Sequence, residues 1–185
     1  MPIKFTKIWD KEFYDEIIDV RSPKEFNEDH IPYSINLPVL SNTEREMVGV
    51  IYKKESPFKA KKIGASLISK NIAQIIKKRL YDKPGNWKPL IYCWRGGKRS
   101  QSIGIVLSEI GWEIKILNGG YRTYRKKVTK KIDVLVKKYK YIVISGETGS
   151  AKSELLRKLG KLKLNIIDLE GLASHKGSLL GKIYN

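Results

Sequence analysis

The sequence predicts an α/β fold built around a parallel sheet, and three observations carry that prediction. Residues 16–20, 90–92 and 113–117 are short apolar runs of the kind that form buried strands. Each run is followed by a proline or glycine signal and then by a segment with helical character. Strands that alternate with helices imply a parallel sheet with helices on both faces. The functional site of such a sheet lies outside the carboxyl ends of its strands.

The first strand leads directly into a helix start. Ser22 can cap the helix, Pro23 suits its first position, and Glu25 stands three residues after Ser22, as in a capping box. Asp19, at the end of the strand, is expected to anchor a loop through Arg21, and the alternative is a catalytic carboxylate.

The next sixty residues give weaker signals. Residues 30–38 are apolar positions broken by prolines, which suits a short strand with turns. His30 is expected to be a hydrogen-bonded structural residue, and no second His or Cys follows at ligand spacing, so no metal site is expected. Residues 41–62 are expected to be a polar connection and residues 61–80 a long helix. The apolar face of this helix would consist of Ile63, Leu67, Ile68, Ile72, Ile75, Ile76 and Leu80.

The stretch from residue 90 to residue 111 contains most of the candidate catalytic and anion-binding residues of the chain. The strand at 90–92 ends on Cys93, the only cysteine of the chain, and a helical pattern follows that stops at Gly111. The loop between them wraps a helix N-terminus, where backbone N–H groups point at an anion. Its residues are Trp94, Arg95, Gly96, Gly97, Lys98 and Arg99. Two glycines and three cations favour a catalytic thiolate in an anion-binding loop over an inert buried cysteine.

A second unit is expected from residue 141. The β-branched strand at 141–145 precedes the segment 146–153, which follows the phosphate-loop pattern G-x-x-x-x-G-K-[ST] with Ala151 in place of the last glycine. Lys152 would reach the outer phosphates and Ser153 would bind Mg²⁺. The phosphate-binding residues are expected to be Gly146, Gly149, Ser150, Lys152 and Ser153. The alternative is a helix start that carries a lysine and binds no ligand.

The second unit reads as an incomplete P-loop NTPase-like βαβ unit. Residues 163–168 form one more apolar run, but a parallel sheet covered on both faces needs more strands than these. We expect a domain at residues 1–125, a basic linker helix at 126–140 and the N-terminal fragment of a P-loop domain at 141–185. The expectations for this fragment are a split or truncated product, a designed chain, or half of an assembly that a separate chain completes.

The net charge of +18 is unevenly distributed. Residues 1–60 hold 9 Lys and Arg against 11 Asp and Glu, whereas residues 61–185 hold 28 against 8. A basic half beside a neutral half indicates a polyanion partner, with nucleic acid the one expected. The alternative is that the many lysines reflect biased codon composition.

Composition also bears on the cellular compartment. No apolar run reaches the roughly 18 residues of a transmembrane helix, and the N-terminus lacks the apolar core of a signal peptide. A single cysteine forms no internal disulfide. We therefore expect a cytoplasmic protein with no membrane partner.

Several of these motifs together resemble a rhodanese domain. They are residues 19–26 with His30-Ile31-Pro32, the cysteine loop after a strand, and Leu117-Asn118-Gly119-Gly120-Tyr121. The resemblance implies that residues 1–125 form a rhodanese-like parallel sheet with helices on both faces.

Longer patterns resemble the tRNA 2-selenouridine synthase family. These patterns are residues 93–100, the phosphate loop downstream, and residues 168–178. The resemblance covers almost all of residues 10–185, which would be the rhodanese part and the beginning of the family's second domain.

The resemblance implies a transferase that modifies the wobble uridine of bacterial tRNA. The family replaces the sulfur of 2-thiouridine by selenium, with selenophosphate as donor. It also attaches a geranyl group from geranyl diphosphate, and the geranylated base is the intermediate that receives selenium. Cys93 would be the catalytic residue, the phosphate loop would hold a small phosphorylated donor, and the basic half would contact tRNA. Both donors are substrates, and no bound metal or prosthetic group is expected.

Three other functions remain open from the sequence. Cys93 and Arg99 obey the C-x-x-x-x-x-R spacing of cysteine phosphatases and arsenate reductases, in which the arginine clamps the anion. Tyr92, however, stands where those phosphatases usually carry His. A thiosulfate sulfurtransferase is the second alternative. A non-enzymatic remnant is the third, since Ala151 and the absent remainder of the second domain could leave the chain inactive alone.

Overall fold

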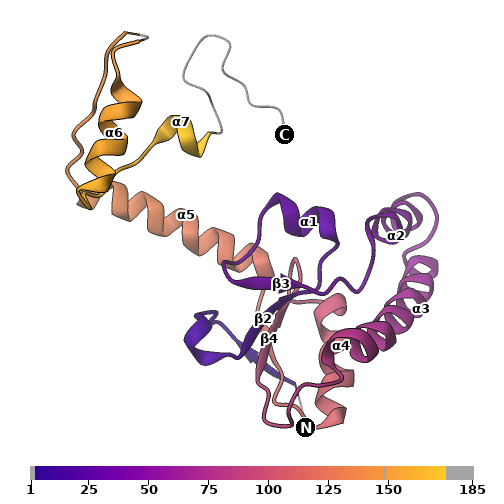
Figure 1. The fold of residues 1–185 in the computed structure, drawn as a ribbon. Coiled ribbons are helices and arrows are strands. Elements are labelled where there is room, and N and C mark those ends of the chain that lie inside the picture. Colours follow the sequence, from indigo (N-terminus) through magenta and orange to yellow (C-terminus); the bar gives the residue numbers. More distant parts are fainter. Residues whose placement is uncertain (1–2, 148, 174–185) are drawn as a thin grey trace. The chain divides into compact units, whose positions relative to one another are not determined.

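The protein is described here by a computed structural model that covers residues 3–147 and 149–173. The chain divides into two compact units, residues 1–135 and residues 136–185. The first unit is built on a five-stranded sheet (Figure 1). Its strands are β1 (Lys4–Thr6), β2 (Glu16–Asp19), β3 (Ser34–Asn36), β4 (Pro89–Tyr92) and β5 (Lys115–Leu117). Its helices are η1 (Lys11–Phe13), α1 (Pro23–Glu28), α2 (Asn42–Lys54), α3 (Pro57–Ile75), the π-helical turn η2 (Ile76–Leu80), α4 (Lys98–Ile110) and α5 (Gly120–Lys138).

The sheet confirms the predicted α/β class. Its strands lie in the order β1-β5-β4-β2-β3, and every neighbouring pair is parallel. Ile18 of β2 aligns with Ile91 of the central strand β4, and Ile91 aligns with Ile116 of β5. Because all strands run in the same direction, the residues that follow them meet at one edge of the sheet. Cys93 is on that edge.

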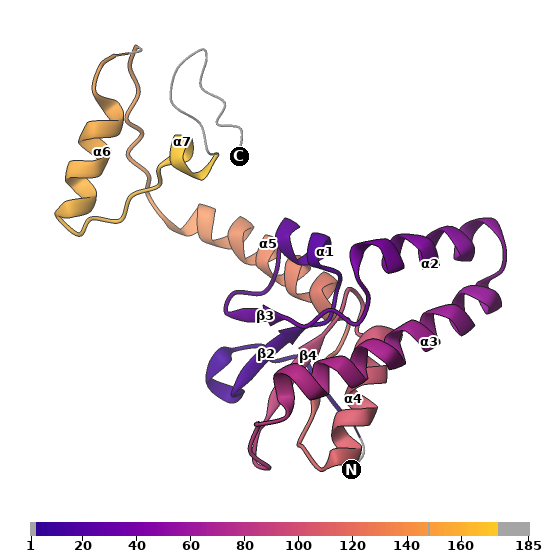
Figure 2. The same ribbon diagram turned by 45° about the vertical axis from the view of Figure 1, so that its right-hand side comes forward.

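Alternation along the strands assigns the two faces of the sheet. Ile18, Ile91 and Ile116 pack in one apolar cluster with side chains of α3 and α4 such as Ile72 and Leu107. Figure 2 shows α3 and α4 along this side, with α2 beside α3. Each fully buried side chain of this size contributes about 1.5–3 kcal/mol to the free energy of unfolding.

The opposite face carries a second, smaller apolar cluster. Ile17, Leu90 and Leu117 pack there against Tyr121 from the first turn of α5. Helices therefore cover both faces, as predicted, and the first turn of α5 is fixed to the sheet.

Several local predictions are confirmed. Ser22 and Glu25 form the capping box of α1, and Gly111 ends α4 with a φ of +114°. His30 donates from Nδ1 to Phe26 O (2.9 Å), and its ring stacks on the Phe26 ring.

Two predictions in the first unit were wrong. Residues 41–62 are no connection, because α2 occupies most of them and α3 begins at Pro57, earlier than residue 61. The signal was present, since Ser41 and Glu44 form a capping box, but α2 buries none of its residues and shows no clear apolar stripe. β1 was also missed, because only three residues pair and two of them are exposed.

The second unit contains α6 (Lys152–Lys161) and α7 (Leu169–Leu172). The helix after the phosphate-loop pattern is confirmed, but the strands predicted at 141–145 and 163–168 are not formed. Ile142 and Val143 are 97% and 82% exposed. A strand needs a neighbour for its backbone hydrogen bonds, and these two runs do not pair with each other.

The boundary between the two units falls within α5, which is one continuous helix. The three-part division of the chain stays a prediction. In the part of the chain that the structure describes, no helix is both long and apolar enough to cross a membrane.

Candidate functional site

Cys93 lies at the carboxyl end of β4 and faces the first turn of α4. Its Sγ is 3.3 Å from Ser100 Oγ and 4.0 Å from Gly97 O, and the residue is 3% exposed. Ser100 Oγ donates to Gly97 O at 3.1 Å. A thiol in this place donates to Ser100 Oγ, whereas a thiolate would draw the Ser100 hydroxyl hydrogen toward itself. The sulfur thus lies between the apolar cluster under α4 and the polar start of that helix.

The cysteine loop is held by the turn that begins α5. Tyr121 N donates to Cys93 O at 2.9 Å, and Arg122 N donates to Trp94 O at 3.1 Å. This approach requires glycine at position 120, because its φ is +57° and a Cβ there would lie 2.1 Å from Cys93 O.

The backbone of the cysteine loop is shaped by its two glycines. Gly96 has a φ of +65°, and Gly97 precedes the first residue of α4 without a capping side chain. Within residues 3–147 and 149–173, nothing accepts a hydrogen bond from the backbone N–H groups of residues 95–99. A row of such donors at a helix N-terminus favours a bound anion.

The three cations of the loop do not surround the sulfur. Arg99 forms two hydrogen bonds with Glu25, Nη1 to Oε2 at 2.6 Å and Nη2 to Oε1 at 3.1 Å. Burial alone would raise the pKa of Glu25, but Arg99 and Ser22 lower it to about 2. Arg95 and Lys98 are exposed. Arg99 is therefore paired with Glu25, and the feature beside Cys93 that favours an anion is the N-terminus of α4.

The expected anchor between Asp19 and Arg21 is confirmed and is fully buried. Arg21 donates to Asp19 Oδ2 from Nε (2.9 Å) and Nη2 (2.6 Å), and Nη2 also donates to Asp29 O (2.7 Å). Burial would lower the pKa of Arg21, but the carboxylate of Asp19 raises it. The guanidinium also lies over the Tyr121 ring at 4.1 Å and 5.9 Å from the Trp94 ring. The pair thereby supports the residue that follows Cys93, a contact that no sequence spacing indicated.

The phosphate-loop segment folds back on its own lysine. Lys152 Nζ donates to Gly146 O (2.7 Å), Glu147 O (2.6 Å) and Ser150 Oγ (3.2 Å). Ala151 adopts a left-handed conformation with a φ of +57°. This is the backbone conformation that the glycine of the pattern would adopt without strain.

The remaining residues of this segment are only partly described. Gly149 has a φ of +86°, and Ser153 Oγ donates to Glu170 Oε2 at 2.9 Å. Asp168 caps α7 through Gly171 N (2.9 Å). Thr148 of the phosphate-loop pattern and residues 174–178 of the downstream motif lie outside the described residues.

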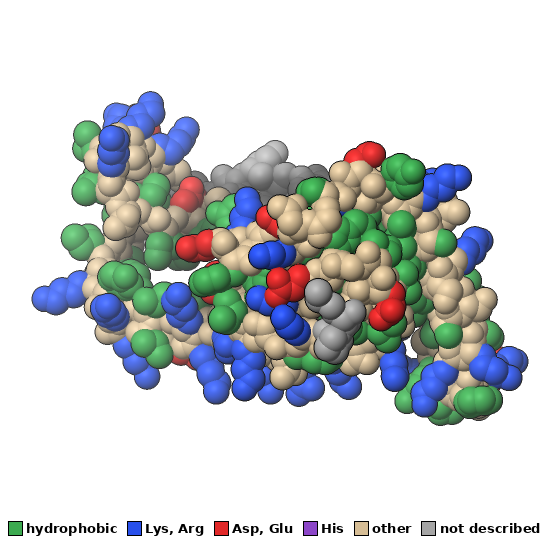
Figure 3. Space-filling view, turned by 90° about the horizontal axis from the view of Figure 1, so that it is seen from below, with side chains coloured by type: hydrophobic (Ala, Val, Ile, Leu, Met, Phe, Trp, Pro, Cys, Tyr) green, Lys and Arg blue, Asp and Glu red, His purple; other side chains and the backbone are tan. Residues whose placement is uncertain are grey.

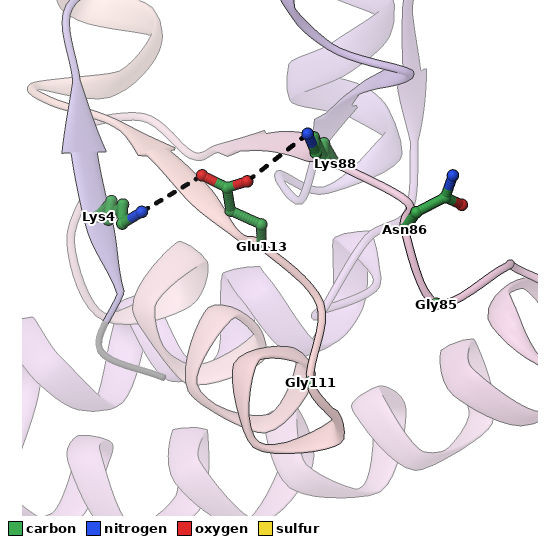
Figure 4. A pocket seen from close by; sticks show the side chains of 6 residues that line it. All are labelled: Lys4, Gly85, Asn86, Lys88, Gly111 and Glu113. Atoms are coloured by element: carbon green, nitrogen blue, oxygen red, sulfur yellow. Dashed lines mark hydrogen bonds and ion pairs between the residues drawn. The ribbon is translucent and has the colours of Figure 1, made fainter.

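A pocket of about 270 Å³ lies at the opposite edge of the sheet from Cys93 (Figure 4). Lys4 and Lys88 both reach Glu113 there, at 3.3 Å and 3.9 Å. These residues stand at or before the amino ends of β1, β4 and β5, so this pocket contains none of the predicted site residues. Nor do three His, Cys, Asp or Glu side chains gather as possible metal ligands anywhere in the described ranges.

A five-stranded parallel sheet with a cysteine in the loop between its central strand and the next helix defines a rhodanese-like protein. The family profile described as "Rhodanese-like domain" matches residues 4–127, more than half of the chain, and the chain belongs to this family. A second profile, "tRNA 2-selenouridine synthase AAA domain", matches residues 139–185.

Curated relatives are similar over both parts. The chain is 41% identical over 167 residues to the tRNA 2-selenouridine synthase of a Sulfurovum species, which covers 90% of this chain and 45% of the relative. It is 38% identical over 166 residues to the enzyme of the same name from Psychromonas ingrahamii, covering 90% of this chain and 44% of the relative. The family resemblance stated from the sequence is confirmed, and the chain spans less than half the length of these relatives.

A solved structure is similar to the first unit. The N-terminal domain of a putative ATP/GTP binding protein from Clostridium difficile 630 has 37% sequence identity and a TM-score of 0.53, and the match covers 60% of this chain and 87% of that chain.

Proposed function

We propose that this chain takes part in replacing the sulfur of 2-thiouridine in tRNA by selenium, through a geranylated intermediate and with selenophosphate as donor. Cys93 is the catalytic thiolate, and the amides of residues 95–99 hold the anionic donor beside it. The observation that carries this proposal is one loop that holds both a thiol, 3.3 Å from Ser100 Oγ, and a row of backbone N–H groups with no acceptor in the described part of the chain.

The phosphate-loop segment has a separate task in this proposal. Gly146, Gly149, Ser150, Lys152 and Ser153 hold the diphosphate of geranyl diphosphate. Lys152 Nζ now donates to two backbone carbonyls and a hydroxyl, and the same donors would turn to phosphate oxygens. The proposal includes tRNA as partner and the cytoplasm as the place of action.

The 185-residue chain is the material for the test. It is incubated with selenophosphate and a tRNA that carries S-geranyl-2-thiouridine at the wobble position, or with selenophosphate, geranyl diphosphate and a tRNA that carries 2-thiouridine there. The digested nucleosides are identified by mass spectrometry. The proposal expects 2-selenouridine with the wild-type chain and none with Cys93→Ser. Absence of any conversion, together with absence of salt-dependent tRNA binding, would leave the non-enzymatic remnant.

The other enzyme classes have their own readouts. Cyanide and thiosulfate report a simple sulfurtransferase by the thiocyanate formed, and an aryl phosphate reports a phosphatase. The phosphatase is disfavoured because Arg99, which would clamp the phosphate, is bound to Glu25 through both Nη atoms.

A further inference from the structure

The first half of α5 is strongly basic. Residues 122–131 hold six Lys and Arg and no acidic residue. The opposite side of the helix packs against the sheet and the N-terminal segment through Tyr121 and Tyr124. The space-filling view in Figure 3 shows a run of Lys and Arg side chains along one edge of the molecule.

Two of the six cations in residues 122–131 have partners in the first unit. Arg125 is bound to Asp29 at 2.6 Å, and Lys127 Nζ lies 4.5 Å from the centre of the Trp9 ring. Arg122, Lys126 and Lys130 are exposed instead, and no carboxylate of the described residues is within ion-pair distance of them. These three are four residues apart, so they form a row along one side of the helix with a rise of about 6 Å per step.

The row begins at the cysteine loop. Arg122 N donates to Trp94 O at 3.1 Å, and the preceding residue, Tyr121, donates from N to Cys93 O at 2.9 Å. Trp94 is 40% exposed, and the centre of its ring lies 5.4 Å from that of the Tyr121 ring, at an interplanar angle of 33°. The row of Arg122, Lys126 and Lys130 therefore begins next to Trp94, the exposed aromatic residue that follows Cys93.

This combination selects the kind of partner. A row of evenly spaced cations fits the regularly spaced phosphates of a nucleic-acid strand. An exposed indole fits an unstacked base, and single-stranded RNA is recognised by stacking on aromatic side chains together with backbone contacts. An acidic peptide would satisfy the cations and would leave the indole without a planar partner.

We propose that Arg122, Lys126 and Lys130 hold the phosphates of a single-stranded RNA segment, and that Trp94 stacks on the base delivered to Cys93. The inference rests on the proposed function and names the surface that positions its RNA substrate. The phosphate contacts supply affinity along the strand, and the stacking contact fixes which nucleotide lies at the thiol.

The test of the row is a salt titration of RNA binding by the full chain. The triple variant Arg122→Gln, Lys126→Gln, Lys130→Gln is compared with Lys61→Gln, Lys77→Gln, Lys78→Gln, which removes the same charge from exposed positions of α3 and η2. With a tRNA that carries uridine at the wobble position, the α5 variant should bind at least about tenfold more weakly at 0.1 M salt. Its plot of log K against log salt should be flatter by about two to three, while the control keeps the wild-type slope.

The stacking contact gives a second, independent signature. Trp94→Ala should weaken RNA binding about tenfold and leave the salt slope unchanged, because stacking releases no counterion, and Trp94→Phe should retain most of the affinity. Polyglutamate, tried as competitor, should displace the RNA poorly.

The outcomes separate this inference from the proposed function. Equal slopes for the two triple variants, or an unchanged affinity of Trp94→Ala, would overturn the RNA surface even if the chain forms 2-selenouridine. Conversely, RNA binding that depends on the α5 row, with no nucleoside conversion by the wild-type chain, would retain the surface and reject the proposed activity.

Discussion

Arg99 and Glu25 join the first turn of α4 to the first turn of α1 across 74 residues of sequence, with Nη1–Oε2 and Nη2–Oε1 distances of 2.6 Å and 3.1 Å. Glu25 also accepts from the backbone N and the hydroxyl of Ser22. One carboxylate therefore caps α1 and holds the helix that starts at the cysteine loop. The sequence indicated Arg99 as an anion ligand, whereas in the structure its guanidinium forms an ion pair with Glu25 that links α4 to α1.

The ion pair between Arg99 and Glu25 predicts a contribution to stability that is lost in acid. The pKa of Glu25 in the folded protein is about 2, below its ordinary value of 4.5, so its contribution is fully present above pH 4.5 and is lost as the pH falls through about 2. Glu25→Gln should lower the free energy of unfolding at pH 7 by on the order of 2–3 kcal/mol, and the difference from wild type should close between pH 4.5 and 2.

Denaturant unfolding followed by tryptophan fluorescence measures this difference, because all four tryptophans lie in the first unit. Glu28→Gln is the matched control, an exposed glutamate at the end of the same helix. A Glu25→Gln difference that stays constant from pH 7 to pH 3 would contradict the assignment.

Gly120 predicts a different kind of failure. A methyl group there would lie 2.1 Å from Cys93 O and 2.6 Å from Gly96 N, on a backbone with a φ of +57°. Gly120→Ala should therefore displace the cysteine loop and cost about 2 kcal/mol or more of the free energy of unfolding. Gly85→Ala, with no atom within 4 Å of its new Cβ, should be tolerated. The rate at which iodoacetamide alkylates Cys93 reports whether the cysteine loop has been displaced. Similar alkylation rates for the two variants would rule out a special role for Gly120.

Apart from β1 and α2, the order of strands and longer helices in the first unit could be predicted because its signals are local. Apolar runs mark the strands, the Ser22–Glu25 box starts α1, and Gly111 ends α4. α2 escaped prediction because a helix that buries none of its residues has only its caps as a signal. The strands expected at 141–145 and 163–168 have strand-forming residues, but pairing partners decide whether such residues form a sheet.

The candidate site could be predicted only as a set of neighbours in sequence. The position of Cys93 before a helix start follows from the order of the elements. The contacts that shape its loop come from Glu25, Arg21 and the turn at Gly120, which are distant in sequence and carry no spacing that would reveal them. Ser100 was part of the motif, and its contact with the sulfur follows once α4 is known to begin at Lys98.

Ser100 is expected to support the reactive form of the sulfur. Its hydroxyl is 3.3 Å from Cys93 Sγ, and a hydrogen bond to a charged atom contributes roughly 1.5–3 kcal/mol. Ser100→Ala should slow the alkylation of Cys93 by iodoacetamide about tenfold at neutral pH. Ser108→Ala serves as control, because Ser108 is a buried serine of the same helix whose hydroxyl donates to Ile105 O at 2.9 Å. Equal alkylation rates for the two variants would show that the hydroxyl is only structural.

Ala151 predicts that the phosphate loop can be improved by a single substitution. The residue holds a φ of +57°, and a left-handed backbone costs an L-residue other than glycine about 1–2 kcal/mol. If this loop binds a diphosphate, Ala151→Gly removes a methyl group and gives the anion a closer approach to the backbone, so the affinity for inorganic diphosphate should rise several-fold. The backbone strain, which the unliganded loop already carries, should be relieved equally in the free and the bound chain. Lys152→Met should abolish the binding, because its ammonium is the charge that the loop offers. Titration calorimetry on the full chain measures the affinity of both variants for diphosphate. If neither substitution changes this affinity, residues 146–153 are not part of the proposed donor site.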